Sequence, residues 1–365
     1  MKFLLVSPFT DASGSSVRFW NIAESLRDRG HTVVYIDRRS RAGNRLHRSS
    51  AIRYYSCPSC GIVHLDILFS CFFNMVLFLR YRDSDVFYAL KPAPNNCSVA
   101  LLARLCGKKI ICDVDDLDWA YLKPGAARTI LHKLFDFFPR LFHLVTFHTP
   151  NLHDYLLQTA RVPESRLYYL AQGISPAFLE ELPERGASEE TAELLYVATL
   201  GITSDFEDLI PALRTFFSSH SGVRMDIAGD GTRRGEFERR IAEAGIASNV
   251  RFVGIIDHRD LPAFVAAHRI GINYMRDSEV NRCRAILKIR EYLACGLEVV
   301  CNDVGDAALF DGYIHIEPTI SALFATVETL LSNPPHRNTE GRAFIGTKYR
   351  WSDIVGAFCE RVEQR

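Results

Sequence analysis

The feature that most constrains this chain is a repeated alternation of short apolar runs with helix-like stretches. In the first half, segments whose apolar residues recur every three or four positions separate apolar runs at 2–7, 31–36, 85–90, 109–112 and 144–147. Such alternation predicts parallel strands joined by crossover helices, with both faces of the sheet covered. The chain is therefore expected to be an α/β protein.

The alternation stops between Ala171 and Thr191, where glycines, prolines and a cluster of glutamates intervene, as in a domain linker. It then restarts with apolar runs at 194–198, 224–228, 250–253, 270–274 and 298–301. A length of 365 residues also exceeds what one hydrophobic core usually holds. The pattern predicts two Rossmann-like domains facing each other across a cleft at the carboxyl ends of their strands.

We place the domain boundaries where the pattern changes. The expected parts are an N-terminal domain over 1–175, a linker over 176–192, a C-terminal domain over 193–340 and a C-terminal helical segment over 341–365.

Composition narrows the class of partner and the compartment. Lys and Arg number 43, as do Asp and Glu, which argues against the broad positive field of a nucleic-acid-binding protein. The ten cysteines are scattered, which favours free thiols in a reducing cytoplasm over a disulfide framework. The apolar stretch Leu65 to Leu79 is shorter than the roughly 20 residues that span a bilayer and contains Asp66 and Asn74, so we expect a buried helix there.

A candidate binding motif lies between Asn281 and Gly296, which read NRCRAILKIREYLACG. As one helix, this segment places Arg284, Lys288 and Glu291 on a shared face. A helix that follows a strand offers unpaired N–H groups and partial positive charge to a diphosphate, and a glutamate accepts hydrogen bonds from a ribose diol. The alternative is a solvated face with weak ion pairing.

The run from Lys288 to Gly305, KIREYLACGLEVVCNDVG, closely resembles the signature of retaining GT-B glycosyltransferases of family 4. The turn Gly229-Asp230-Gly231 and the segment Asn249 to Gly254 resemble the same family, and the likeness covers 194–310. It is looser in the first half, at 165–178 and in the loop at 8–16. The helix-like segment at 351–362 resembles the family's C-terminal helix, which returns to the N-terminal domain.

This resemblance implies transfer of a sugar from a nucleoside-diphosphate sugar to an acceptor hydroxyl, without a metal or another cofactor. It assigns ribose binding to Glu291 and phosphate binding to Lys288. The donor-binding residues that we expect are Asp277, Asn281, Arg284, Lys288, Glu291 and Gly229.

The chain departs from the family pattern at two places. Cys283 stands where many members carry a glutamate that holds the transferred sugar, so Asp277 or Asn281 is expected to contact the sugar instead. The segment 198–209, ATLGITSDFEDL, lacks the Arg and Lys that clamp the diphosphate in the family. Either Lys288 and Arg284 replace this clamp, or donor binding is weak or absent.

In the first half, the run CDVDD at 112–116 places three carboxylates at the end of a strand, facing the predicted cleft. We expect Asp115 and Asp116 to be the catalytic pair that contacts acceptor or sugar; a cation site and a structural turn are the alternatives. Gly14 and Ser15 form a candidate acceptor loop before the first helix.

Two further features bear on metals and membranes. Cys57 and Cys60 resemble half of a zinc ribbon, but no second pair lies at ribbon spacing, so no metal is expected. The segment 130–147 is rich in phenylalanine and basic residues; it builds the N-terminal core or, alternatively, rests on a membrane or grips a lipid-linked acceptor.

The sequence leaves open whether the acceptor is a sugar, a lipid-linked molecule or a small molecule. We expect a cytoplasmic protein without a nucleic-acid partner, with peripheral contact at the inner face of the membrane as a variant. A non-catalytic GT-B scaffold and a sugar-nucleotide epimerase of the same architecture are the alternative functions.

Overall fold

The computed structural model describes residues 1–10, 13–39, 51–182 and 192–364. They form two compact units that are discontinuous in sequence. Unit 1 comprises Met1–Gly173, Cys283–Ala285 and Trp351–Arg365, and unit 2 comprises Ile174–Arg282 and Ile286–Arg350. Most of the predicted linker, at 183–191, lies outside the described residues. Within the expected C-terminal segment, the part that belongs to unit 1 begins at Trp351.

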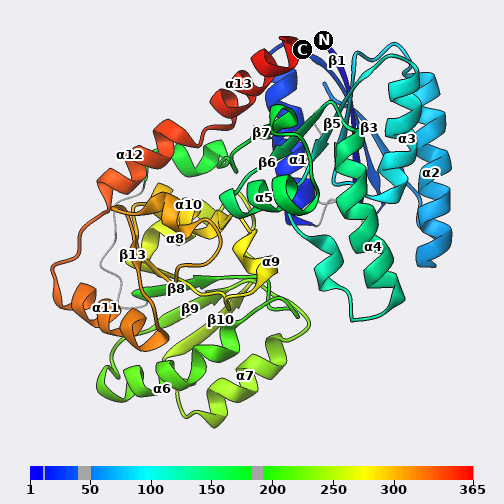
Figure 1. The fold of residues 1–365 in the computed structure, drawn as a ribbon. Coiled ribbons are helices and arrows are strands. Elements are labelled where there is room, and N and C mark those ends of the chain that lie inside the picture. Colours follow the sequence, from blue (N-terminus) through cyan, green and yellow to red (C-terminus); the bar gives the residue numbers. More distant parts are fainter. Residues whose placement is uncertain (11–12, 40–50, 183–191, 365) are drawn as a thin grey trace. The chain divides into compact units, whose positions relative to one another are not determined.

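The part of unit 1 that the structure describes contains a sheet of seven parallel strands in the order β3-β2-β1-β4-β5-β6-β7 (Figure 1). The strands are β1 (Lys2–Thr10), β2 (Thr32–Arg38), β3 (Arg53–Cys57), β4 (Val86–Leu90), β5 (Lys109–Asp113), β6 (Leu144–Phe147) and β7 (Leu167–Tyr169). The strand order reverses between β1 and β4, which is where sheets of this kind usually bind ligands.

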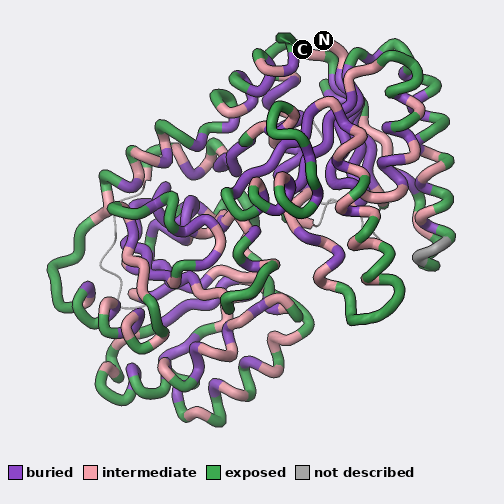
Figure 2. The backbone as a smooth tube through the Cα atoms, in the orientation of Figure 1, coloured by how far each residue is buried: buried purple, intermediate pink, exposed green. Residues whose placement is uncertain are grey.

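Helices cover both faces of this sheet, and the strand residues alternate between the two cores. On one face lie α1 (Gly14–Asp28) and α13 (Trp351–Glu363), and on the other lie α2 (Val63–Arg80), α3 (Pro94–Leu105) and α4 (Ala126–Phe137). Leu4 and Val6 of β1 face the second group of helices, whereas Phe3 and Leu5 face the first. The short α5 (Pro150–Asp154) follows β6. Figure 2 shows the strands of this unit as mainly buried.

Unit 2 is built on the same plan. Over its described residues, six parallel strands run in the order β10-β9-β8-β11-β12-β13. The strands are β8 (Leu194–Val197), β9 (Met225–Ala228), β10 (Val250–Gly254), β11 (Ile270–Asn273), β12 (Glu298–Cys301) and β13 (His315–Ile316). The helices are α6 (Ile210–Ser219), α7 (Arg234–Glu243), α8 (Leu261–Ala267), α9 (Glu279–Arg282), α10 (Leu287–Ala294), α11 (Ile320–Ser332) and α12 (Thr339–Lys348). The predicted α/β class with two parallel sheets is confirmed.

Close packing against the sheet fixes the position of α10. The ring of Tyr292 lies so near β11 that a Cβ atom at Gly271 would come within 2.3 Å of it. The Tyr292 hydroxyl also accepts a hydrogen bond of 2.8 Å from the backbone N–H of Val197 on β8. One aromatic side chain thus anchors the helix to two strands.

The prediction of a single helix from Asn281 to Gly296 is wrong. The segment is divided into α9 and α10, and residues 283–286 between them are not helical. Cys283 is buried in the core of unit 1, and its carbonyl accepts a hydrogen bond of 3.0 Å from the Thr149 hydroxyl. Tertiary burial therefore overrides the helix pattern, and Arg284 is not on the helix that carries Lys288.

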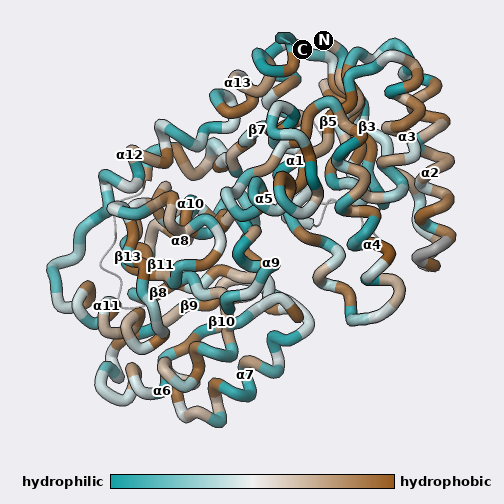
Figure 3. Tube along the Cα trace, in the orientation of Figure 1, coloured by the Kyte–Doolittle hydropathy of each residue, from teal (hydrophilic) through white to brown (hydrophobic). Residues whose placement is uncertain are grey.

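The prediction of a helix at 65–79 is confirmed, but the prediction that this helix is buried is wrong. A helix forms there, but much of its apolar side is exposed, and Figure 3 shows hydrophobic residues along most of α2. None of the helices in the described part of the chain is long and apolar enough to cross a bilayer. In the neighbouring aromatic segment at 130–147, Phe135, Phe142 and Phe147 are buried and Phe137 is exposed, so most of these rings do build the core.

We predict that Gly271→Ala destabilises unit 2, because the new methyl group overlaps the Tyr292 ring. The cost should be about 1–3 kcal/mol of unfolding free energy, measured by urea denaturation. Gly235→Ala in α7 is the control. A Cβ atom there meets nothing within 4 Å, so that change should stabilise by about 0.5–1 kcal/mol. Equal effects of the two substitutions would contradict the packing described for Tyr292.

Candidate active site

The strongest candidate residues in unit 2 lie on α10, which follows the carboxyl end of β11. The Lys288 ammonium lies 2.7 Å from the Glu291 carboxylate, one helical turn away. Glu291 is buried, whereas Lys288 is partly exposed. The structure therefore brings together the two residues predicted to bind ribose and phosphate, and each is the other's ionic partner.

A fully buried ion pair supports the start of this helix. Arg290 donates a hydrogen bond of 2.6 Å to one oxygen of Asp306, and the other oxygen accepts one of 2.8 Å from the N–H of Ile286, the residue before α10. The Arg290 guanidinium also lies 4.8 Å from the ring centres of both Phe310 and Tyr349. Sequence reasoning missed this pair, since the pattern of α10 does not show that Asp306 returns to it.

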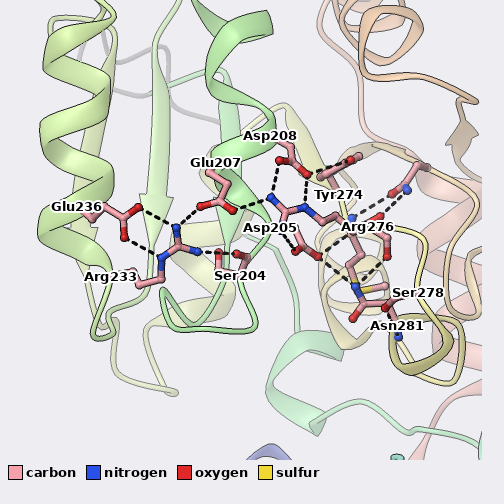
Figure 4. Close-up of polar contacts among 12 residues, drawn as sticks. Ser204, Asp205, Glu207, Asp208, Arg233, Glu236, Tyr274, Arg276, Ser278 and Asn281 are labelled. Carbon is pink, nitrogen blue, oxygen red and sulfur yellow. Dashed lines mark hydrogen bonds and ion pairs between the residues drawn. The ribbon is translucent and has the colours of Figure 1, made fainter. Parts of the chain in front are cut away.

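An acidic cluster occupies the segment after β8, where the family places its basic clamp. Figure 4 shows Glu207 between two guanidinium groups, with one carboxylate oxygen bonded to Arg233 and the other, at 2.6 Å, to Arg276. Asp208 accepts two hydrogen bonds of 2.6 Å from Arg276, and the N–H of Arg276 donates to Asp205 at 2.9 Å. Hydrogen bonds from Arg233 and Arg276 lower the pKa of Glu207, and those from Arg276 lower that of Asp208.

Two of the predicted sugar-contacting residues have local partners. The Asn281 amide donates to the Asp205 carboxylate at 3.1 Å and to the Arg276 carbonyl at 2.9 Å, so it holds the loop after β11 (Figure 4). Asp277 is exposed and forms an ion pair with Arg282. Asn281 therefore holds a loop beside the acidic cluster, whereas Asp277 lies at the surface.

Gly229, also predicted to bind the donor, has a clear conformational role. Its φ of 127° is one that favours glycine, and a Cβ atom there would lie 1.9 Å from the Ala198 carbonyl oxygen. The glycine therefore lets the loops after β8 and β9 approach each other at the carboxyl edge of the sheet.

In unit 1, the carboxylates of the CDVDD run do not all face the same place. Asp113 is fully buried, accepts hydrogen bonds of 3.0 and 3.3 Å from the Arg18 guanidinium, and accepts one of 2.5 Å from the Thr146 hydroxyl. The expectation that all three carboxylates face a cleft is wrong for Asp113, because it neutralises a buried arginine. Arg18 also donates to the carbonyl of Leu170 at 2.7 Å, which ties α1 to the segment after β7.

Asp115 belongs to a second cluster at the carboxyl ends of β4 and β5. The Lys91 ammonium lies 3.1 Å from Asp115 and 2.6 Å from Asp118, and it sits 4.9 Å above the Phe9 ring. Lys91 is buried and has a positive φ of 64°, an uncommon conformation for a residue with a side chain. Sequence reasoning missed this lysine, which follows a different strand from its carboxylate partners.

Opposing effects set the charges of this cluster. Burial by itself raises the pKa of Asp115, but Lys91, His148 and a hydrogen bond from Ser15 lower it below its ordinary value. Burial also raises the pKa of Asp118, to about 6, against the opposing effect of Lys91. Asp115 is thus held as a carboxylate beside a cation, and Ser15 of the predicted acceptor loop lies with it.

Asp116 points to different partners from Asp115. It accepts hydrogen bonds of 2.6 Å from the Tyr121 hydroxyl and 2.8 Å from the N–H of Leu117. The Arg284 guanidinium lies 3.9 Å from the same carboxylate and 5.6 Å from the centre of the Tyr121 ring. The structure therefore groups Arg284 with unit 1, apart from the helix on which it was predicted.

The acceptor loop predicted at Gly14 and Ser15 is only weakly constrained at Gly14. A Cβ atom at Gly14 would meet nothing within 4 Å, so nothing around this position requires glycine. Residues 11–12 of the predicted acceptor loop lie outside the described residues.

Across the residues that the structure describes, no group of three or more His, Cys, Asp or Glu side chains is placed to hold a metal ion. Cys57 is buried and Cys60 exposed, both as free thiols.

Comparison with known proteins agrees with this architecture. Residues 12–178 match the model described as Glycosyltransferase Family 4, and residues 191–333 match the model described as Glycosyl transferases group 1. The chain belongs to the GT-B glycosyltransferases of family 4.

Two curated relatives and one solved structure illustrate the likeness of this GT-B chain. It is 27% identical to a glycogen synthase of Mycobacterium tuberculosis over 174 residues, 46% of this chain and 41% of that protein. It is 25% identical to the alpha-D-kanosaminyltransferase of Streptomyces kanamyceticus over 202 residues, 52% and 51% of the two chains. The matches thus span about half, or less, of these relatives. The crystal structure of HepE from Anabaena in complex with UDP superposes with a TM-score of 0.75 at 15% identity, covering 100% of both chains.

We predict that Arg290→Met destabilises this GT-B protein by about 3–5 kcal/mol, because it leaves the buried Asp306 carboxylate without its cation. Urea denaturation measures the loss. Arg282→Met is the matched control: it breaks the exposed pair with Asp277 and should cost less than about 1 kcal/mol. A loss from Arg290→Met as small as that of the control would contradict the supporting role of the buried pair.

A second prediction concerns pH. Because the pKa of Asp118 is raised to about 6, its stabilising contribution is present at low pH and is lost as pH rises through that value. The unfolding free energy of wild type should therefore fall relative to Asp118→Asn between about pH 4.5 and pH 7. Asp83→Asn is the control, since a hydrogen bond from Lys2 lowers the pKa of Asp83 to below this range. A constant difference for Asp118→Asn would contradict the assignment.

Proposed function

We propose that this GT-B chain transfers a sugar from a nucleoside-diphosphate sugar to an acceptor hydroxyl with retention of the anomeric configuration. In this reaction the bond between the anomeric carbon and the phosphate oxygen breaks. The acceptor oxygen bonds to that carbon on the same face, and the acceptor proton leaves with the diphosphate. The observation that carries the proposal is the Lys288–Glu291 pair on α10. The buried pair of Arg290 and Asp306 holds the start of the same helix.

The chemistry of α10 fits a nucleotide. The helix has no acidic residue in its first turn, and the side chain of Ile286 before it caps no backbone N–H. Because Asp306 already accepts the N–H of Ile286, the N–H groups that follow would offer the partial positive charge to a phosphate group. A buried carboxylate at Glu291 accepts two hydrogen bonds from a ribose diol. In the proposed complex, Lys288 exchanges part of its contact with Glu291 for a phosphate oxygen. HepE, the structural neighbour whose complex contains UDP, makes a nucleoside diphosphate the first ligand to test.

The Lys91 cluster of unit 1 supplies the proposed acceptor side. Asp115 stays charged because Lys91 lies beside it, and a charged carboxylate accepts a hydrogen bond from an acceptor hydroxyl and orients it. Asp116 is already bonded to Tyr121 and Leu117, so we assign it a positioning role. The proposed acceptor class covers sugars, lipid-linked molecules and small molecules.

A non-catalytic GT-B protein is the second candidate, and the acidic cluster favours it. Asp205, Glu207 and Asp208 hold Arg276, and Glu207 also holds Arg233. Arg233 and Arg276 lie outside the clamp's position at 198–209, and they do not replace the clamp, because carboxylates already occupy their guanidinium groups. Absence of nucleotide binding at millimolar concentration would favour this candidate. Free nucleoside diphosphate formed without an acceptor, or an epimerised donor, would argue against transfer.

We predict that Glu291→Ala raises the Kd for the nucleoside diphosphate at least about tenfold, because two hydrogen bonds from the ribose to a charged group are lost. Isothermal titration calorimetry against a panel of nucleoside diphosphates identifies the base and measures the change. Glu328→Ala, at an exposed position on α11, should leave the Kd unchanged. If wild type and Glu291→Ala bind the same nucleotide equally well, Glu291 is not the ribose ligand.

A further inference from the structure

Helix α2 exposes a row of apolar residues, although Leu77 and Phe78 near its end are buried in the core. Its exposed residues are apolar and recur at helical spacing, with Leu68 and Phe72 exposed by 66% and 65%. The complete exposed stripe on α2 is Leu65, Leu68, Phe69, Phe72, Met75, Val76 and Leu79. An exposed apolar stripe of this length is unusual for a protein surface that faces only water.

The inner side of α2 is unusually polar. Asp66, Ser70 and Asn74 follow one another at intervals of four residues, and all three are buried. Asp66 accepts hydrogen bonds of 2.9 Å from the Arg38 guanidinium and 2.6 Å from the Ser59 hydroxyl. Because its polar residues are used inward, the orientation of the helix is fixed, and the apolar stripe cannot turn toward the core.

The neighbouring helices extend this surface. α2, α3 and α4 cover the same face of the sheet in unit 1. On α3, Leu101 and Leu105 are exposed, and on α4, Ile130 and Phe137 are exposed. The apolar surface therefore belongs to a layer of three helices. Figure 2 shows which parts of these helices are exposed, and Figure 3 shows which parts are hydrophobic.

The exposed charges of this layer have one sign. Among side chains that the structure describes on α2, α3 and α4, the exposed charged residues are Arg80, Arg104 and Lys133. A hollow of about 780 Å³ near the end of α3 is also basic, but Val362 of α13 and Leu144 line it too, so it does not belong to the outer face of these three helices. The cations that line it are Arg104, Lys108, Lys109 and Arg166. An apolar stripe flanked by cations complements a surface with apolar depth and negative headgroups.

We propose that the outer face of α2, α3 and α4 docks on the surface of a bilayer that contains anionic phospholipids. The stripe enters the boundary between headgroups and acyl chains, while Arg80, Arg104 and Lys133 contact the phosphates. A second copy of the chain fits less well, because two such faces would bring cations toward cations. The one partly exposed carboxylate on the described part of these helices, Asp136, already pairs with His132 and Tyr155. Membrane docking does not depend on the proposed transfer reaction, and a separate experiment tests it.

The test is flotation of the full chain with unilamellar vesicles of phosphatidylcholine alone or mixed equally with phosphatidylglycerol. Wild type should bind the mixed vesicles at least tenfold more than the neutral ones, and added salt should weaken this binding. Leu68→Gln combined with Phe72→Gln should lower binding at least tenfold. Ile255→Gln combined with Leu309→Gln, exposed apolar residues of unit 2, should not change it.

Two further measurements keep the outcome decisive. Phe72→Trp retains an apolar ring, and its fluorescence should shift to shorter wavelength with the mixed vesicles if this residue enters the bilayer. Light scattering of wild type after gel filtration tests the second-copy arrangement. No binding to either vesicle type, equal binding by wild type and the Leu68/Phe72 variant, or a dimer that this variant dissolves would each overturn the proposal.

Discussion

Each unit depends on an arginine and an aspartate that are buried together beneath the carboxyl edge of its sheet. In unit 2, Arg290 and Asp306 fix Ile286, the residue before α10, and in unit 1, Arg18 and Asp113 join α1 to the ends of β5 and β7. Two charges removed from water are tolerable only when their geometry satisfies both partners. These pairs therefore fix where the adjoining loops lie. The loops in turn determine where their exposed side chains are placed.

The sequence was sufficient for the interior of both sheets. The predicted strands 144–147 and 298–301 agree with β6 and β12, since continuous apolar runs reflect burial on both faces. It was insufficient at three of the four edge strands, β3, β7 and β13, which carry short or half-exposed sequences such as Arg53–Cys57. The fourth edge strand, β10, was predicted at 250–253. A strand with one neighbour needs less hydrophobic surface, so the periodic signal weakens there.

The candidate sites show the same division. The resemblance located Glu291 and Lys288 on one helix, because the motif is contiguous and its helical spacing is local. It did not locate Lys91 or Arg276, which reach their carboxylate partners from other strands. The failure at residues 283–286 has a related cause: the helix pattern continues through Cys283, but burial of that side chain in unit 1 ends the helix. Contacts between distant segments carry no periodic signature.

In the proposed complex, the charges of unit 2 limit how a diphosphate would be held. Arg276 makes charge-assisted bonds to Glu207 and Asp208, and Arg233 makes them to Glu207 and Glu236. Moving either arginine to a phosphate would break several of the strongest polar contacts in the unit. Lys288 is held by only one side-chain hydrogen bond and is partly exposed, so it changes partner at lower cost. In the proposed complex, the start of α10 then contributes the rest of the positive potential, so we expect its fixation by Asp306 to matter to binding as much as the lysine.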